Sequence, residues 1–94
     1  MNKYYVYILA NKKYWILYVW ITNNLLRRIY EHKEWKLAWF TRKYFIKKLV
    51  YFEEYDNPQD AIFREKQLKK RKRDWKIELI EKNNLNWNDL YNVI

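Results

Sequence analysis

The sequence predicts an α/β (α+β) fold in which a small three-stranded antiparallel sheet is flanked by helices. Three short runs rich in β-branched and aromatic residues indicate the strands. Segments with helical spacing of apolar residues lie between and after these runs. The chain has 94 residues and contains no linker, internal repeat or low-complexity segment, so we expect a single domain over residues 1–94.

The first two strands are expected to form an antiparallel hairpin. They cover residues 3–9 and 16–22, and the polar residues 11–14 separate them. Because side chains alternate between the two faces of a strand, Tyr7 and Tyr18 can converge on one face of this hairpin.

The remaining elements follow from capping signals. Thr22 and Asn23 are good N-cap residues for a helix that runs to about Lys33, after which residues 34–45 are expected to form a mixed loop. Residues 48–54 indicate the third strand.

Two more helices are expected after this strand. Asp56-Asn57-Pro58 places a cap and a first-turn proline before a helix that runs to about Lys70. Asp74 is a candidate cap for a further helix, and residues 86–91 are expected to form a short final turn. The buried side of that further helix is expected to carry Trp75, Leu79 and Ile80.

Composition limits the possible functions. The formal net charge of +9 favours a polyanionic partner, although nucleic acids and acidic membrane surfaces attract the same charge. The chain has no cysteine, which excludes a disulfide framework and a thiolate metal site. Residues 1–9 are too short and too rich in tyrosine for a signal peptide, and no segment is long enough to span a bilayer. We therefore expect a cytoplasmic protein without a membrane association.

Helical spacing brings two basic side chains onto an apolar face. The side chains at three, four and seven positions after Leu25 share one side of the first helix with it. They are Arg28, Ile29 and His32. Alternative interpretations are a surface arginine, a histidine favoured by the helix dipole, and tyrosines that only pack in the core.

A carboxylate falls within the apolar stripe of the next helix. Glu65 lies between Ala61 and Leu68 at helical spacing, and carboxylates are rarely buried without a partner or a metal. The alternative is an ordinary ion pair between Glu65 and Lys69 one turn later.

Four blocks in order resemble the GIY-YIG nuclease family. Tyr5-Val6-Tyr7 corresponds to its first motif and Tyr18-Val19-Trp20 to its second. Residues 22–32 are similar to the helix that carries the family's arginine, and residues 61–70 to the helix that carries its metal-binding glutamate. The resemblance is to small stand-alone bacterial members related to the nuclease domain of the excision-repair incision subunit.

The resemblance implies a metal-dependent DNA endonuclease that hydrolyses phosphodiester bonds in DNA repair or recombination. Glu65 would hold Mg²⁺, or another divalent cation such as Mn²⁺, and Arg28 would clamp the scissile phosphate. Tyr7 would be the general base or a relay to it, and its pKa near ~10 would have to be lowered by the cation and Arg28. Tyr18 would orient the water or the phosphate, and His32 would assist proton transfer or contact phosphate.

A basic run follows the predicted glutamate helix and would contact the DNA backbone. Its alternative interpretation is a solvated helix end. Some family members use an additional amide side chain, for which Asn83 and Asn84 are candidates without a motif to assign them. The run consists of Lys69, Lys70, Arg71, Lys72 and Arg73.

Tryptophan stands where the family usually or often has glycine, and the chain has no glycine at all. An indole at a position with positive φ, or where a backbone approaches a ligand, costs on the order of 1 kcal/mol or more. Either glycine was excluded by design, or UGA codons that mean glycine in the source lineage were read as tryptophan, which is the hypothesis we favour. UGG codons at these positions would contradict it, whereas Trp75 and Trp87 are at positions suited to tryptophan. The four positions are Trp15, Trp20, Trp35 and Trp39.

Two other functions stay open from the sequence. One is a nonenzymatic nucleic-acid-binding module on the same scaffold, which a genuine Trp20 would favour. The other is a domain that works only when a repair protein recruits it.

Overall fold

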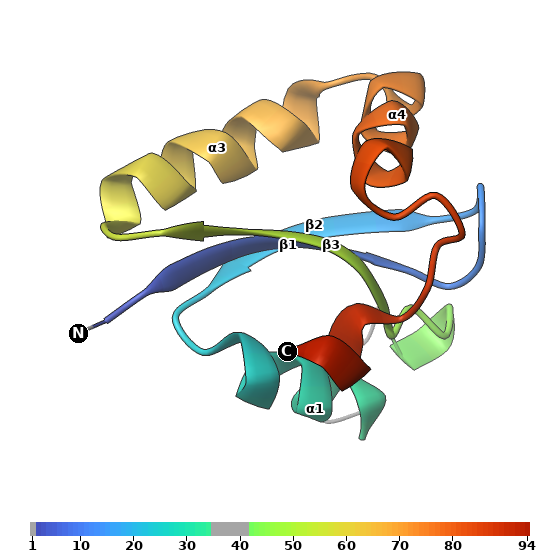
Figure 1. Ribbon diagram of the computed structural model, residues 1–94, viewed down its shortest axis with the longest axis horizontal. Helices are drawn as coiled ribbons and strands as arrows, with labels where there is room; N and C mark the ends of the chain where they lie inside the picture. Colours follow the sequence, from blue (N-terminus) through green and yellow to red (C-terminus); the bar gives the residue numbers. More distant parts are fainter. Residues whose placement is uncertain (1, 35–41) are drawn as a thin grey trace.

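A three-stranded antiparallel sheet with helices on both faces forms the centre of the molecule (Figure 1). The computed structural model describes residues 2–34 and 42–94. The strands are β1 (Tyr4–Ala10), β2 (Leu17–Thr22) and β3 (Lys48–Tyr55), in the order β2-β1-β3. The predicted fold class is therefore confirmed.

The central strand β1 contributes to two hydrophobic clusters. Val6, Ile8 and Ala10 pack on one face of the sheet, and Tyr7 and Leu9 pack on the other. This is the result of strand alternation in a sheet that is covered on both sides. A site that uses Tyr7 must therefore lie on the second face.

Helix α1 (Leu25–Lys33) covers the face of the sheet that carries Tyr7. The predicted cap at Thr22 or Asn23 is wrong by one or two residues, because Asn24 Oδ1 accepts the backbone N–H of Arg27 at 3.1 Å. Thr22 Oγ1 instead accepts the N–H of Asn24 at 3.1 Å, which orients the chain before the helix starts.

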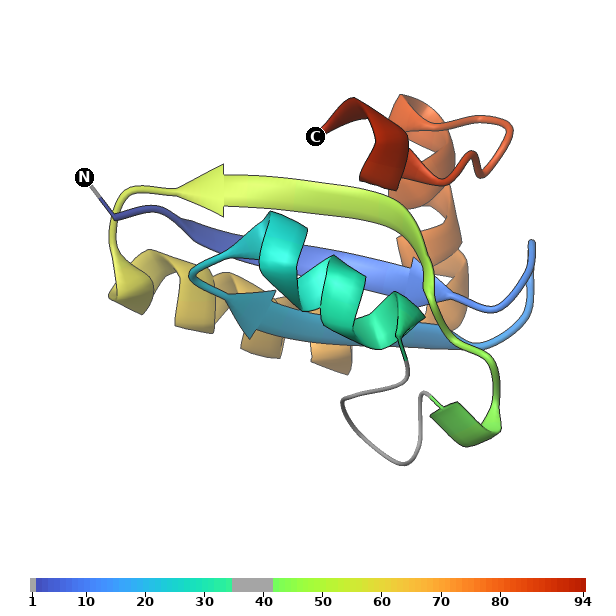
Figure 2. The same ribbon diagram turned by 90° about the horizontal axis from the view of Figure 1, so that it is seen from below.

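Helices α3 (Pro58–Lys70) and α4 (Arg73–Asn83) lie on the opposite face, as Figures 1 and 2 both show. Asn57 caps α3 by accepting the N–H of Asp60 at 2.9 Å, with Pro58 following it, as predicted. Lys72, which makes no side-chain cap bond, precedes α4, and Asp74 lies in the first turn rather than at the predicted cap. On α4, Trp75 and Leu79 are partly buried and Ile80 is fully buried, as expected.

An ion pair attaches α3 to the sheet. Arg64 on α3 donates from Nε and Nη2 to the two carboxylate oxygens of Glu53 on β3, each at 2.9 Å. The Tyr55 hydroxyl donates to Glu53 at 2.6 Å. The next residue on α3 is Glu65, so this bidentate pair helps to fix the backbone that presents Glu65.

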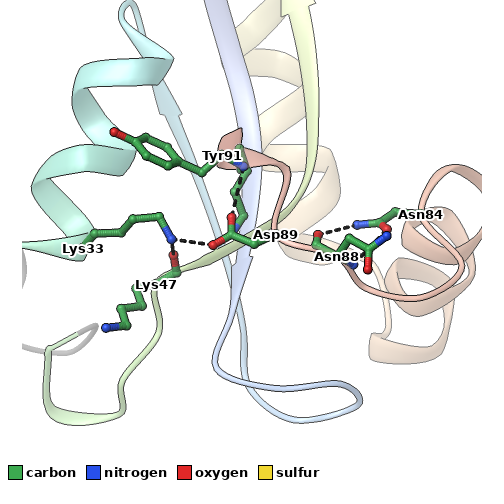
Figure 3. A network of polar contacts seen from close by, with 7 residues as sticks. Lys33, Lys47, Asn84, Asn88, Asp89 and Tyr91 are labelled. Carbon is green, nitrogen blue, oxygen red and sulfur yellow. Dashed lines mark hydrogen bonds and ion pairs between the residues drawn. The ribbon is translucent and has the colours of Figure 1, made fainter. Parts of the chain in front are cut away.

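The C-terminal segment joins α1 to β3 through Asp89 (Figure 3). Asp89 pairs with Lys33 in the last turn of α1 and accepts the N–H of Leu49 at 3.3 Å and of Tyr91 at 3.0 Å. The short 3-10 helix η1 (Leu90–Val93) follows, so the final turn lies slightly later than predicted. The end of α1 that carries His32 is thus held by residues far along the chain.

The segment before β3 is only partly described. Arg42 and Lys43 are helical, within the stretch that was expected to be a loop. Trp35 and Trp39 lie outside the described residues. Among the helices of the described ranges, none has the length and apolar character needed to cross a membrane.

Candidate active site

Tyr7 and His32 form the centre of the candidate site. Tyr7 lies on β1 and is fully buried, and its hydroxyl lies 3.2 Å from Nε2 of His32 on α1. The two rings meet edge to face, with centroids 6.0 Å apart. The pairing follows from the burial of both side chains between the sheet and α1, since each polar group needs a partner there.

Tyr18 on β2 contacts the same histidine. Its ring centroid lies 5.8 Å from that of His32, again with an edge-to-face orientation. In the β1–β2 register Tyr18 lies opposite Leu9 and Trp20 lies opposite Tyr7. The predicted convergence of Tyr7 and Tyr18 is therefore found, with His32 between α1 and the hairpin as their common neighbour.

Arg28 acts on Tyr7, Tyr18 and His32 through its positive charge. It lies one turn before His32 on α1, and its Nε is 3.6 Å from a carboxylate oxygen of Glu31. The positive charge of Arg28 lowers the pKa of Tyr7, of Tyr18 and of His32, although it is the second cause after burial for each group. One guanidinium thus acts on all three side chains.

Burial determines the protonation states in this group. It raises the pKa of Tyr7 well above its usual value and also raises that of Tyr18, because a phenolate is poorly solvated there. It lowers the pKa of His32 to about 4, with Arg28 acting in the same direction. Arg28 lowers the pKa of Tyr7, as direct action of Tyr7 as a base would require, but burial outweighs this single charge. All three groups are neutral near pH 7.

The second ring nitrogen of His32 lacks a partner. Nδ1 is buried and makes no hydrogen bond to any of the residues that the structure describes. If Nε2 accepts the Tyr7 proton, the neutral ring carries its own proton on Nδ1. Such an unsatisfied buried group is uncommon in proteins and often marks a functional site.

Glu65 lies on α3, on the other side of the sheet from Tyr7. It lies on α3 in the predicted stripe with Ala61 and Leu68, all three are buried, and Glu65 is 8% exposed. Ala61 and Leu68 belong to the cluster on the face opposite Tyr7. The Glu65 carboxylate pairs with Lys69, so the burial and the ion pair that were considered as alternatives occur together.

Trp20 and Lys69 connect Glu65 to the tyrosines around the edge strand β2. The Lys69 ammonium lies 3.7 Å from the centroid of the Trp20 ring, a cation–π contact. Trp20 in turn stacks on Tyr18, with centroids 6.0 Å apart and planes inclined by 22°. The contacts run in sequence through Glu65, Lys69, Trp20, Tyr18, His32 and Tyr7.

The donor set at Glu65 fits a hard divalent cation that keeps most of its water. Within residues 2–34 and 42–94 no group of three or more His, Cys, Asp or Glu side chains surrounds a common point. A single carboxylate, with water and phosphate oxygens as the other ligands, is a usual arrangement for Mg²⁺ at a phosphoryl site. The Lys69 ammonium now neutralises this carboxylate, so a cation at Glu65 would replace Lys69.

Trp15 and Trp20, the two of the four tryptophans that the structure describes, do not have the positive φ that was expected to strain the backbone. Positive φ among the described residues occurs at Tyr14, Phe45 and Trp87, and neither Trp15 nor Trp20 is in this set. At Trp20 the indole matters because of its stacking on Tyr18, on the strand that borders the site. Trp87 has φ 56 but is buried, and its Nε1–H donates to Glu81 at 2.7 Å.

The basic run spans the junction of α3 and α4 and is exposed throughout. Lys69 differs from the rest because it is engaged with Glu65 and Trp20. Arg71 lies over the ring of Trp75 at 4.7 Å. The basic run therefore begins one helical turn after Glu65 on α3.

The two amide candidates have structural partners. Asn84 is buried and donates to the carbonyl oxygens of Val50 and Asn88, at 3.0 and 2.9 Å, as Figure 3 shows for Asn88. Asn83 donates to the carbonyl of Leu79 at 3.2 Å. Sequence reasoning missed the Trp20–Lys69 contact and the role of Asp89, because nothing in the spacing of these residues links them across the sheet.

Comparison with known proteins gives a consistent assignment. The family model described as the GIY-YIG catalytic domain matches residues 3–78. A UPF0213 protein of Pediococcus pentosaceus is 34% identical over 90 residues, which cover 96% of this chain and 94% of that protein. A UPF0213 protein of Clostridium perfringens is 45% identical over 76 residues, 81% of each chain.

A solved structure supports the same relationship. The solution NMR structure of a UPF0213 protein from Bacillus halodurans superposes with a TM-score of 0.58 at 28% sequence identity, covering 93% of this chain and 92% of that one. The names of these relatives state no activity. The extent of the family match shows that the chain belongs to the GIY-YIG family of nucleases, together with the small UPF0213 proteins.

Proposed function

We propose that this protein is a metal-dependent DNA endonuclease that acts as a single domain over residues 1–94. The observation that carries the proposal is the group of Tyr7, Tyr18, Arg28 and His32, drawn from three elements and centred on one buried hydrogen bond. Phosphodiester hydrolysis needs an activated water, charge stabilisation at phosphorus and help for the leaving oxygen. The proposed site offers a candidate for each need.

Arg28 binds the scissile phosphate. Its charge lowers the pKa of Tyr7, Tyr18 and His32. Its planar guanidinium can donate hydrogen bonds to two phosphate oxygens at once. A bound phosphodiester offsets the charge of Arg28. It thereby removes the second of the two causes that keep the pKa of His32 low.

Tyr7 and His32 act together on the attacking water. The Tyr7 phenol is neutral, so it relays rather than stores a proton: its own proton passes to Nε2 of His32 while its oxygen accepts one from water. The neutral imidazole at 3.2 Å makes this transfer geometrically direct. Tyr18, whose ring meets that of His32 edge to face, orients the water or the phosphate.

Glu65 would hold the metal, for which Mg²⁺ or Mn²⁺ suits a single carboxylate whose remaining ligands are water and phosphate oxygens. When bound, such a cation supplies charge stabilisation to the phosphate and to the leaving oxygen. Lys69 must leave Glu65 for this to happen, and its flexible side chain allows that.

Lys70, Arg71, Lys72 and Arg73, with Lys69 when it is displaced, contact the DNA backbone without reading sequence. A role in DNA repair or recombination is the biological setting that we propose. A cytoplasmic location and recruitment by a repair protein stay predictions from the sequence.

The experiment compares Arg28→Ala with Arg27→Ala. Both arginines lie on α1, but Arg27 is exposed and Arg28 faces the site, so the pair controls for loss of charge and helix propensity. We expect Arg28→Ala to lower cleavage of branched, nicked or plain duplex DNA with Mg²⁺ by about 10²–10³-fold, and Arg27→Ala to have little effect. Equal activity of the two variants would refute the proposed site.

A second function is favoured by one specific observation. Lys69 and Trp20 occupy the space between Glu65 and Tyr18, which is the state of a nucleic-acid-binding module without catalysis. This alternative predicts salt-sensitive DNA binding without strand scission, even after glycine replaces the four tryptophans. Metal-dependent cleavage by the glycine variant would exclude it.

A further inference from the structure

One end of the sheet carries a second surface that the catalytic group does not use. The turn between β1 and β2 and the segment before β3 lie at the same end in both views (Figures 1 and 2). Asn11 joins them, since its Nδ2 donates to the carbonyl of Tyr44 at 3.4 Å. Asn11 Oδ1 also accepts the N–H of Ile16 at 3.1 Å, which closes the turn.

Exposed aromatic rings gather on this end. Trp15 is 52% exposed, Tyr44 38% and Phe45 68%, although large aromatic side chains are usually buried in proteins. Lysines accompany them: the Lys12 ammonium lies 4.4 Å from the Trp15 centroid, and that of Lys43 lies 5.5 Å from the Tyr44 centroid. We call Lys12, Lys43, Tyr44, Phe45 and Lys47 the hairpin-end surface, and we leave out Trp15 because glycine is the residue we favour at that position.

The backbone of this region holds an aromatic side chain in an unfavourable conformation. Phe45 has φ 56, a left-handed value that is uncommon for a bulky residue, and its ring stays exposed. Burial of the ring therefore does not account for the strain. Tyr14 has φ 59 as well, but its ring packs edge to face on Trp87, with centroids 5.4 Å apart.

The charge of the region has one sign. Residues 11–16 and 42–48 contain no Asp or Glu, and their basic residues are Lys12, Lys13, Arg42, Lys43, Lys47 and Lys48. Glu81 interacts with Tyr14, which does not belong to the hairpin-end surface. A protein-binding patch usually has few lysines at its centre, whereas rings alternating with lysines are typical of surfaces that bind unpaired nucleic acid strands.

We propose that the hairpin-end surface binds the unpaired bases of a nucleic acid strand by stacking, with its lysines on the phosphates. This inference rests on the proposed function in one respect, because it takes the cut phosphate to lie at Arg28 near Tyr18. The substrate class is therefore DNA with an unpaired stretch close to the cut.

The test measures binding and not cleavage, so that its failure is separate from failure of the nuclease proposal. A fluorescein-labelled oligothymidylate and a blunt duplex of the same length are titrated with the protein in EDTA, and anisotropy gives each affinity. The main variant is Phe45→Gly, because glycine accommodates the left-handed conformation and should not lower the melting temperature. The control is Phe63→Leu, which alters a 70% exposed ring on α3.

We expect Phe45→Gly to weaken binding of the single strand about tenfold and to leave duplex binding unchanged. Tyr44→Leu should act in the same direction, Phe45→Tyr should retain binding, and Lys43→Ala should weaken both ligands because it removes a phosphate contact. Unchanged single-strand affinity in Phe45→Gly and Tyr44→Leu would overturn the proposal. Equal losses for single strand and duplex in Phe45→Gly would overturn it too, since they would show attraction by charge alone.

Discussion

The α1 face of the sheet and the edge of β2 contribute the candidate site in different ways. On the α1 face, Tyr7 and His32 are buried and meet through one hydrogen bond that core packing fixes. At the β2 edge, Glu65 is held by Lys69, whose side chain also covers Trp20. The first arrangement depends on the whole fold, and the second depends on a few contacts that the partly exposed Lys69 side chain makes.

This difference separates two requirements of a nuclease. Proton transfer needs fixed geometry at a short distance, which a buried pair between sheet and helix provides. Metal binding needs a carboxylate that can exchange its partner, and Lys69, the partner of the buried Glu65 carboxylate, is itself partly exposed and can move into solvent. A change at the β2 edge can therefore alter metal binding without disturbing Tyr7 and His32.

The largest expected effect comes from removing the carboxylate at the β2 edge. Glu65→Ala should lower Mg²⁺-dependent cleavage about 10³-fold, because the metal loses its protein ligand. The measurement is kcat/KM on a nicked duplex, in the parent chain and in Trp20→Gly. Glu78→Ala, an exposed glutamate on α4, is the control and should be neutral. Cleavage that survives in Glu65→Ala would remove Glu65 from the metal site.

The buried histidine on the α1 face makes stability depend on pH. The pKa of His32 is lowered from 6.5 to about 4 in the folded protein, so the unfolded chain takes up a proton first as the pH falls. The free energy of unfolding should therefore decrease between pH 6.5 and 4, by up to about 3 kcal/mol. Urea denaturation across this range measures it.

His32→Gln provides the control for this pH dependence. The chain has one histidine, so the variant keeps the carboxylate titrations and loses only the imidazole. The difference between the two curves should grow toward low pH. Parallel curves would mean that His32 is protonated as easily in the folded state as in the unfolded state.

Removing the Tyr7 hydroxyl tests the α1 face, and we expect a smaller loss of cleavage than for Glu65→Ala. Tyr7→Phe should lower kcat about 10²-fold with little change in KM, since the water loses its proton acceptor while the phosphate keeps Arg28. Tyr5→Phe is the matched control, because Tyr5 lies on the same strand and packs beside the same cluster. A Tyr7→Phe enzyme with full kcat would assign the proton transfer to another group.

The smallest effect is expected at Trp20. Trp20→Gly removes the cation–π contact that holds Lys69 next to Glu65, and contacts of this kind are worth about 1 kcal/mol. Mg²⁺ should therefore bind Glu65 about fivefold more tightly, as measured by calorimetry. Trp15→Gly, in the exposed turn, should leave Mg²⁺ affinity as it is. Equal affinity in both variants would show that Trp20 does not oppose the metal.

The sequence was informative wherever a local pattern decides the structure. Asn57-Pro58 marked the start of α3, and alternation put Tyr7 and Tyr18 on one face. The spacing of Leu25, Ile29 and His32 gave the buried side of α1. These features depend on residues a few positions apart, so propensity and periodicity are sufficient to predict them.

Contacts between distant residues were not predictable in this way. Burial decides the pKa of Tyr7, and burial depends on how α1 packs on the sheet. The Lys69–Trp20 contact depends on how far a lysine side chain extends from α3 past the edge strand. The roles of the predicted site residues in catalysis stay predictions until the variants above are measured.

The Asp89 network has a consequence for how the site forms during synthesis. Asp89 holds Lys33 across 56 positions of sequence, so the end of α1 with His32 is fastened by a residue that the ribosome adds much later. Contacts of such long range form late in folding. The hairpin with Tyr7 and Tyr18 can pair early, whereas the position of His32 against it is completed late. A partly synthesised chain would thus expose the basic residues of α1 before its site is assembled. It could then bind nucleic acid before it could cleave it.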